Sequence, residues 1–248
     1  MNTIYILWLR QIKRYLRSRS RIFGSLGQPL LFLVALGFGL GPIFKKAGGG
    51  NYIDFLAPGV IAQGILFTAI FSGIELIWDR QFGFLKETLV APVSRLEIML
   101  GRTLGGATIA VIQGVIIFLL TMVIGFRPYS LVMLPVFFLV MFLIALLFTA
   151  MGTAIASILE DFQGFQLIMN FLVMPLFFLS GALFPLKGLP PFLAVITKLN
   201  PLTYGVDGLR ATLIQTAHFL MWTNLGVLTG LSLIFLAIGS YLFSKIQI

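Results

Sequence analysis

Long apolar runs separated by short polar breaks dominate the chain. These runs occupy residues 22–44, 55–78, 103–126, 130–159, 162–184 and 219–243. A helix of about 20 apolar residues crosses the hydrocarbon core of a bilayer, so each run is long enough to do so. The pattern predicts an all-α membrane protein in which a single domain, residues 1–248, contains six transmembrane helices.

The segment 1–21, before the first run, divides into two faces at helical spacing. Its apolar face consists of Ile4, Tyr5, Trp8, Ile12 and Tyr15. Its basic face consists of Arg10, Lys13, Arg14, Arg17 and Arg21. This division predicts an interfacial helix, with the apolar face at the headgroup boundary and the basic face on anionic lipid or an acidic partner. The run that follows exceeds the apolar core of a cleaved signal peptide, which favours a retained first span.

The segment 79–102, between the second and third runs, is charged and has its own helical pattern. Phe82, Leu85 and Leu89 form a short apolar stripe at helical spacing. Pro92 ends this helix, because the residue before a proline is disfavoured in the α region. The stripe predicts a short cytoplasmic helix that docks on a partner, and the alternative is a plain polar connector between two spans.

A second helix start follows the proline. Ser94 and Glu97 have the spacing of a capping box, in which the serine hydroxyl and the glutamate carboxylate accept hydrogen bonds from free amides at the helix start. Beyond it, Gly101 and Gly105 are small residues four apart, a spacing that lets helix backbones approach closely in lipid.

Prolines interrupt the chain between the fifth and sixth runs, over residues 185–217. Pro185, Pro190, Pro191 and Pro201 leave no room for a full span there. Two short apolar pieces, Phe192–Leu199 and Leu202–Ile214, are expected to be helices that dip into the membrane or cap it. Irregular backbone at membrane depth must be buried in protein or line a water-filled cavity.

The distribution of Lys and Arg predicts the orientation. Six spans place both termini on one side, together with segment 79–102 and the turn at residues 160–161. That side has eleven Lys and Arg against six on the other. Positive charge concentrates in cytoplasmic loops, so both termini are expected in the cytoplasm.

The composition agrees with a membrane protein and removes several other classes. Hydrophobic residues make up 59% of the chain and charged residues 10%, whereas soluble domains average about 45–50% and 25%. The net charge of +9 lies beside apolar runs, which favours anionic lipid over nucleic acid as its partner. With no cysteine and His218 as the single histidine, disulfides, thiolate chemistry and a histidine-built metal site are excluded or nearly so.

The chemistry that is missing points to an external energy source. No ionisable residue lies near the middle of a run, which disfavours a secondary transporter driven by protons or sodium; an ATP-independent channel stays an alternative. The chain has no GxxxxGK[ST] loop, so it does not bind ATP in the P-loop manner. An integral membrane enzyme remains an alternative, with Glu75 and Asp79 as paired carboxylates or His218 as a base. The favoured interpretation is that the two carboxylates cap a helix beside Arg80 and that His218 is interfacial.

Two motifs carry a resemblance to a known family. Residues 198–210 read KLNPLTYGVDGLR, which resembles the Asn-Pro-Leu-x-Tyr-x-x-Asp-x-Leu-Arg motif of the type-2 permeases of ABC exporters. A second pattern is similar to the drug-resistance branch that includes daunorubicin exporter permeases, and consists of Asp79, Arg80, Gly83, Glu87, Pro92, Ser94, Gly101 and Arg102. Lys86 departs from that pattern, where an acidic or small polar residue is common. The resemblance covers nearly the whole chain.

The resemblance implies that this chain is a subunit of a larger transporter and is not itself an enzyme. A homodimer, or a heterodimer with a similar permease, would be clamped by two ATPase subunits that bind ATP and Mg, while this chain holds no cofactor. The cargo would be a hydrophobic or amphipathic drug, lipid or glycolipid leaving the cytoplasm or inner leaflet. The location implied is the plasma (inner) membrane of a prokaryote.

The resemblance also assigns roles to residues. Segment 82–91 would be the coupling helix in a cleft of the ATPase, with the N-terminal helix beside it. Its coupling residues would be Arg80, Phe82, Gly83, Leu85, Lys86, Glu87, Leu89 and Pro92. Segment 185–217 would be an external re-entrant gate with Asn200, Pro201, Tyr204, Asp207 and Arg210. From their spacing, Asp207 and Arg210 are expected to pair with each other or with backbone carbonyls, the alternative being an exposed surface pair.

Overall fold

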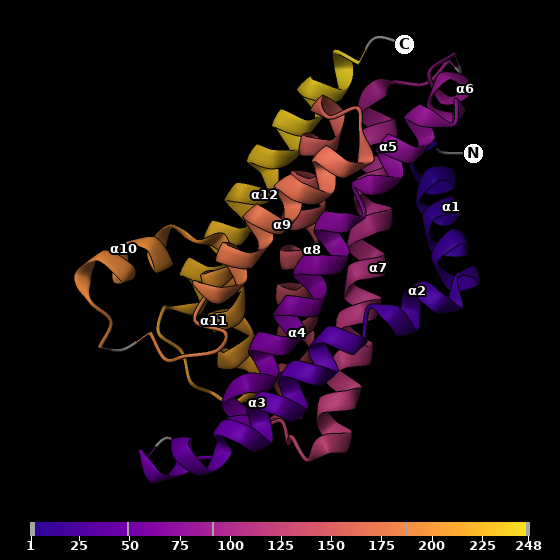
Figure 1. Ribbon diagram of the computed structural model, residues 1–248. Helices are drawn as coiled ribbons and strands as arrows, with labels where there is room; N and C mark the ends of the chain where they lie inside the picture. Colours follow the sequence, from indigo (N-terminus) through magenta and orange to yellow (C-terminus); the bar gives the residue numbers. More distant parts are fainter. Residues whose placement is uncertain (1–2, 49, 91, 187, 247–248) are drawn as a thin grey trace.

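The computed structural model describes residues 3–48, 50–90, 92–186 and 188–246, and all regular structure within these ranges is helical (Figure 1). The helices are α1 (Thr3–Arg17), α2 (Arg19–Gly24), α3 (Gly27–Lys46), α4 (Tyr52–Phe71), α5 (Ile74–Gln81), α6 (Phe84–Val90), α7 (Arg95–Ile124), the 3₁₀ turn η1 (Leu131–Met133), α8 (Leu134–Ile158), α9 (Phe162–Phe178), α10 (Pro191–Leu199), α11 (Pro201–Leu213) and α12 (Met221–Ser244). The predicted all-α class is confirmed.

Within the described ranges, five stretches are long and apolar enough to cross a membrane, one fewer than the sequence predicts. They are residues 19–46, 52–81, 95–124, 131–158 and 221–244. The remaining expected span, 162–184, is helical only as α9, whose 17 residues rise about 26 Å at 1.5 Å each.

Side chains explain why α9 ends early. Beyond Leu179 the backbone carbonyls bond to side chains from other elements rather than to amides of a continuing helix. Tyr52 donates its hydroxyl hydrogen to the carbonyl of Leu183 at 3.0 Å. Arg210 donates to the carbonyls of Gly181 and Ala182 at 2.8 and 3.3 Å. The irregular backbone is thus satisfied within the protein, as membrane depth requires.

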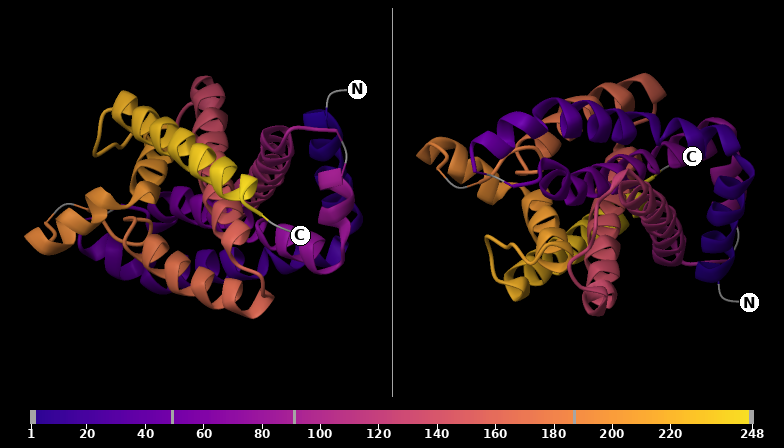
Figure 2. Two further views of the ribbon diagram at one scale, coloured as in Figure 1. Left: turned by 90° about the horizontal axis from the view of Figure 1, so that it is seen from above. Right: turned by 90° about the horizontal axis from the view of Figure 1, so that it is seen from below.

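Helix α4 forms the centre of the bundle. Every residue from Leu56 to Leu66 is buried, because α3, α7, α8 and α11 all pack around it. A helix that is apolar on all sides suits a core position of this kind, as it also suits a membrane span. In both views along the bundle, α1 and α10 lie on opposite flanks of this core (Figure 2).

The predicted close approach at Gly101 and Gly105 is present, and the partner is α1. A Cβ atom at Gly101 would lie 2.9 Å from the Cβ of Leu7, and one at Gly105 would lie 2.7 Å from the Cβ of Gln11. Only glycine therefore allows α1 to lie so close to α7. The N-terminal helix packs on the protein through this contact and is more than a membrane-surface helix.

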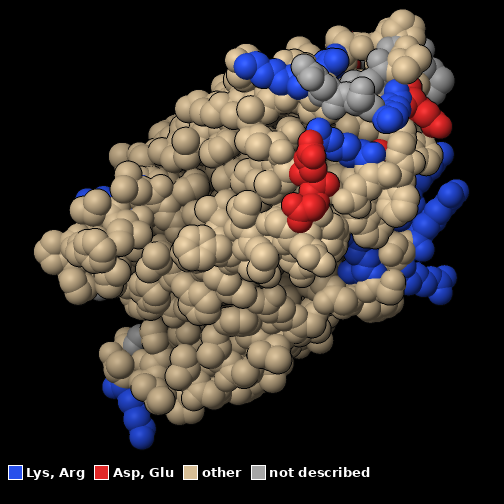
Figure 3. Space-filling model, turned by 45° about the horizontal axis from the view of Figure 1, so that its top comes forward, with Lys and Arg blue, Asp and Glu red and all other residues tan. Residues whose placement is uncertain are grey.

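One end of the bundle gathers segments that are distant in sequence. Arg80 on α5 pairs with Glu160 in the α8–α9 turn at 3.1 Å. Arg95, the first residue of α7, donates to the carbonyl of Ile246 near the C-terminus at 3.1 Å. On the face seen in Figure 3, charged side chains are concentrated around this end, and the broad middle shows almost none. We call this the charged end.

Candidate functional site at the charged end

Gly83 separates α5 from α6 and sets the direction of the short helix. The residue has φ +80°, a left-handed conformation that glycine adopts without strain. It follows Phe82, whose amide still bonds to the carbonyl of Trp78 at 2.9 Å, so Gly83 is the glycine that ends α5. A new helix then starts at Phe84. The helix expected over 82–91 is present as α6, but it begins at Phe84 rather than at Phe82, and its expected end at residue 91 lies outside the described residues.

The restart changes which side chains are presented to the outside. Phe82, Phe84 and Val90 are 77%, 50% and 86% exposed, and we call these three residues the apolar tip. Leu85 is 1% exposed and belongs to the core, which corrects its expected docking role. The side chain of Leu89 lies outside the described part of the chain.

Charged residues border the apolar tip. Lys86 and Glu87 on α6 are exposed, as is Pro92 in the link to α7. The predicted capping box is present at the start of α7: the amide of Glu97 donates to Ser94 Oγ at 3.2 Å, and the amide of Ser94 donates to Glu97 Oε2 at 3.3 Å. The tip is thus formed by the end of α5 and by the short helix α6, between two well-defined helix ends.

Asp79 on α5 connects the base of the tip to two other elements, α1 and α7. Its buried carboxylate pairs with Arg102 on α7, with Arg10 at 3.3 Å and with Arg14 at 3.7 Å on α1. The guanidinium of Arg10 also lies 4.7 Å from the centre of the Phe84 ring. We call Asp79 and these three arginines the Asp79 cluster. It fixes α1, α5 and α7 to one another directly beneath α6.

Glu75 lies one turn before Asp79 and pairs with Arg21 on α2. Arg80, the expected neighbour of both carboxylates, instead bonds to Glu160. Both carboxylates are therefore bound by arginines from the N-terminal segment or α7. This arrangement favours a structural role for Glu75 and Asp79 over paired acid–base catalysis.

The two faces of α1 do not have the expected surroundings. On the apolar face, Trp8 Nε1 donates to Thr108 Oγ1 at 3.0 Å, and the Tyr15 hydroxyl donates to Gln113 Oε1 at 2.7 Å, so this face packs on α7. Burial raises the pKa of Tyr15 above its ordinary value, an effect that the charge of Arg21 partly opposes.

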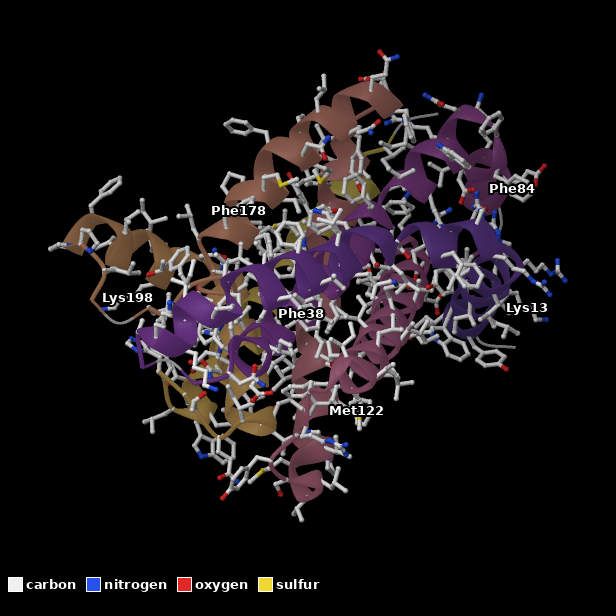
Figure 4. The ribbon with its side chains drawn as sticks, turned by 60° about the horizontal axis from the view of Figure 1, so that its bottom comes forward. Lys13, Phe38, Phe84, Met122, Phe178 and Lys198 are labelled. Atoms are coloured by element: carbon white, nitrogen blue, oxygen red, sulfur yellow. The ribbon has the colours of Figure 1, made fainter. Side chains whose placement is uncertain are left out.

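On the basic face, only part of the expected surface remains available to lipid. Arg10, Arg14 and Arg21 bond to the acidic residues of α5, whereas Lys13 and Arg17 are exposed. Lys13 and Phe84 lie at the same end of the molecule (Figure 4).

The motif residues at the opposite end are packed around the start of α11. Asn200 caps this helix by accepting from the amide of Leu202 at 2.9 Å, and its side-chain amide donates to the carbonyl of Leu176 at 2.7 Å. Pro201 is the first residue of α11. The Tyr204 hydroxyl donates to the carbonyl of Lys198 at 2.8 Å.

Asp207 and Arg210 are both buried, which excludes the exposed surface pair. Arg210 bonds to backbone carbonyls, one of the two expected arrangements, and its guanidinium lies 3.9 Å from the centre of the Phe55 ring. Asp207 accepts from the amides of His218 and Phe219 at 2.6 and 3.0 Å, which lie just before α12. The two charges therefore hold different segments: Arg210 the irregular backbone after α9, and Asp207 the start of α12.

Replacing Asp207 with alanine is expected to lower the free energy of unfolding by about 2 kcal/mol, because two backbone amides and the side-chain amide of Asn224 lose their acceptor. Thermal unfolding of the purified protein in detergent measures this. Asp161→Ala, which removes the exposed cap of α9, is the matched control and should cost less. Equal effects of the two substitutions would contradict the role given to Asp207.

Several site residues were not found from the sequence. A stripe on one continuous helix does not include Phe84 or Val90. The Phe82-Gly83 pair is the signal in the sequence for a helix end at this position. The pairing of Asp79 with Arg10, Arg14 and Arg102 had no local signal, since the partners are 23 to 69 residues away.

Comparison with known proteins gives a family match over most of the chain. Residues 2–214 match the family model described as "ABC-2 type transporter". The matched range includes the apolar tip, the Asp79 cluster and the whole of α11.

Individual relatives are similar over most of their length. The transport permease ycf38 of Pyropia yezoensis is 33% identical over 84% of this chain and 72% of its own. The ycf38 permease of Porphyra purpurea is 29% identical over 93% of this chain and 83% of its own. Nodulation protein J of Rhizobium leguminosarum bv. trifolii is 29% identical over 83% of this chain and 76% of its own.

Proposed function

Since this chain belongs to the ABC-2 type transporter family, we propose that it forms, with a second permease copy and two ATPase subunits, an ATP-driven exporter of a hydrophobic or amphipathic cargo. The chain is the multi-pass permease subunit, and ABC-2 permeases work with ATP-binding subunits. The three relatives described above are named as transport permeases and a nodulation protein. A place in the drug-resistance branch is therefore a narrower proposal.

The observation that carries this proposal is the apolar tip. Phe82 and Val90 are more than three-quarters exposed at the charged end, beside Lys86 and Glu87. An apolar centre with a charged rim is the usual composition of a protein–protein interface. We assign this surface to a cleft of the ATPase subunit, which places the charged end and both termini in the cytoplasm of a prokaryotic cell.

The Asp79 cluster supplies the mechanical connection. An ATPase that moves α6 also moves α5, and ion pairs to Asp79 carry that movement to α1 and α7. Gly105 lies against Gln11, so α1 and α7 shift together rather than slide. ATP binding and hydrolysis in the partner thus act on the transmembrane helices through packed contacts.

The second copy and the cargo path are assigned to the outer face of α9. Gln163, Gln166 and Asn170 are exposed and lie along one stripe of this otherwise apolar helix. Polar side chains in a membrane usually bond across helices or border water. A second copy of the permease packed near this stripe supplies helices across which these side chains can bond. The cargo path between the two copies supplies the water that they border.

The external segment completes the proposed path. Helices α10 and α11 form a unit attached to the bundle by Asp207 and Arg210, and α10 projects from the flank of the molecule (Figure 1). We assign this unit to the external gate. Asn200 and Tyr204 stabilise the turn between its two helices.

The double substitution Phe82→Ser and Phe84→Ser is expected to weaken attachment of the ATPase subunit by about thirtyfold. Truncating buried interface anchors costs about 2 kcal/mol or more, and 1.4 kcal/mol corresponds to about a tenfold change in Kd. The measurement is the amount of ATPase that co-purifies with the permease at a series of subunit concentrations. Cargo-stimulated ATP hydrolysis is followed in parallel.

Two controls separate docking from folding. Phe192→Ser changes a 74% exposed aromatic on α10 and should leave attachment at the wild-type level. Leu85→Ala removes a core residue and should lower thermal stability instead. Wild-type attachment in the double variant would mean that α6 is only a connector, and the proposed coupling would be wrong.

A further inference from the structure

A cavity of about 220 Å³ lies between the N-terminal elements and α4. Tyr15 of α1, Arg21 of α2 and the start of α3 form one wall, and α4 from Gln63 to Phe71 forms the other. Gly24 and Gln28, at the rim, are exposed. The cavity is separate from the apolar tip and from the α10–α11 unit. It lies where the N-terminal segment turns into the first candidate span.

The wall of the cavity contains an amide that the protein does not satisfy. Gln63 is fully buried, and neither its side-chain nitrogen nor its side-chain oxygen has a hydrogen-bond partner among the described residues. Leaving a buried polar group unpaired costs about 1–3 kcal/mol. Next to it, the Tyr15 hydroxyl donates to Gln113 and keeps its oxygen lone pairs for an incoming donor.

The electrostatics of the wall favour an uncharged ligand group. Arg21 is the charged residue among the cavity's lining, and it is paired with Glu75. The other polar groups in the wall are neutral amides and hydroxyls from Gln28, Ser25 and Thr68. A ligand that both donates and accepts hydrogen bonds fits this wall better than an anion, which would compete with Glu75 for Arg21.

We propose that this cavity binds the uncharged head group, bearing hydroxyls or amides, of the amphipathic cargo as it enters the transporter from the adjacent leaflet. The hydrocarbon part of the cargo lies along the outer face of α3, where Leu31, Val34 and Phe38 are exposed (Figure 4). Gln63 recognises the head group through its amide. This inference rests on the proposed export function and names the chemical class of its cargo.

Binding is tested without the ATPase, on the full chain in phosphatidylcholine nanodiscs. The probe is tritiated dodecyl glucoside, which combines a hydroxyl-bearing head with one alkyl chain. We expect saturable binding that weakens about tenfold in Gln63→Leu, the loss of roughly one hydrogen-bonded contact. Gln28→Leu, at the exposed rim, should weaken binding in the same direction without affecting the fold.

Thr149→Val is the matched control. Thr149 is buried, and its hydroxyl oxygen also has no partner among the described residues, but it does not line the cavity. Its substitution should leave glucoside binding unchanged. Equal binding by the wild type, Gln63→Leu and Gln28→Leu would overturn the proposal. Stronger binding of dodecyl phosphate than of dodecyl glucoside would also overturn it.

Transport distinguishes cargo from a resident lipid. In proteoliposomes that contain the ATPase, ATP-driven movement of dodecyl glucoside should fall in Gln63→Leu in parallel with its binding. Weaker binding with unchanged transport would mean that the cavity holds a resident lipid, and the proposal would fail. Normal binding by a wild-type protein that shows no ATP-driven transport would overturn the export function and support the head-group site.

Discussion

Asp79→Ala is expected to destabilise the folded permease by about 3–5 kcal/mol, enough to remove most of it from the membrane. Removing one partner of a buried ion pair leaves an uncompensated buried charge, and a loss of this size is typical. Asp79 is 4% exposed and its carboxylate contacts Arg102, which is itself 5% exposed. Arg10 and Arg14 of α1 lose the same partner. Membrane-inserted protein and its unfolding temperature in detergent are the two measurements.

The matched substitution for Asp79→Ala is Glu160→Ala. It breaks the ion pair with Arg80, but the Glu160 side chain is 79% exposed. Exposed pairs contribute at most about 1 kcal/mol, so this variant should accumulate normally. The double variant Asp79→Leu and Arg102→Leu removes both buried charges and should recover part of the stability. A protein that tolerates Asp79→Ala as well as Glu160→Ala would show that the Asp79 cluster does not hold α1 in place.

Gly152→Ala is expected to cost about 3 kcal/mol or more, because it forces apart two helix backbones. A Cβ atom at Gly152 of α8 would overlap the backbone carbonyl oxygen of Ile70, the penultimate residue of α4. A Cβ atom at Gly73, between α4 and α5, would lie 2.5 Å from the carbonyl oxygen of Gly152. Overpacking usually costs 1–3 kcal/mol when side chains can adjust, and backbone atoms have less freedom to do so.

Gly230→Ala on α12 is the control for this crossing. No atom lies within 4 Å of a Cβ placed there, so alanine should leave stability unchanged or raise it by up to about 1 kcal/mol. Both variants are compared by thermal unfolding in the same detergent. Equal unfolding temperatures would mean that α4 and α8 do not cross as closely as Gly73 and Gly152 indicate. The crossing bears on the proposed function because α5, which leads into the apolar tip, begins at it.

The sequence alone determined the features that depend on neighbouring residues. Runs of apolar residues predicted where the long helices lie, since hydrophobic length is a local property. Ser94 and Glu97 predicted the start of α7, because a capping box involves four consecutive residues. The break around Pro185 and the short helices that follow it were also correctly predicted from proline positions. The family resemblance likewise depended on short motifs.

Only the tertiary structure decided which of these side chains are exposed and which are buried. Leu85 and Phe84 are adjacent, yet one is in the core and the other is exposed, because Gly83 restarts the helix in a new direction. Residues 162–184 are uncharged and mostly apolar, yet α9 ends at Phe178, and Tyr52 and Arg210 bond to the carbonyls beyond it. Such bonds join residues that are far apart in the chain, and no local periodicity encodes them.

The N-terminal helix illustrates the same division. Its two faces were visible in the sequence because each follows the helical repeat. What each face contacts was not visible, because distant elements cover part of each face: α7 approaches through Gly105, and the carboxylates of α5 bind Arg10 and Arg21. Composition and spacing specify an amphipathic helix. Buried charges are stabilised only when folding brings a partner of opposite charge close to them. The ion pairs between α1 and α5 therefore make α1 part of the bundle.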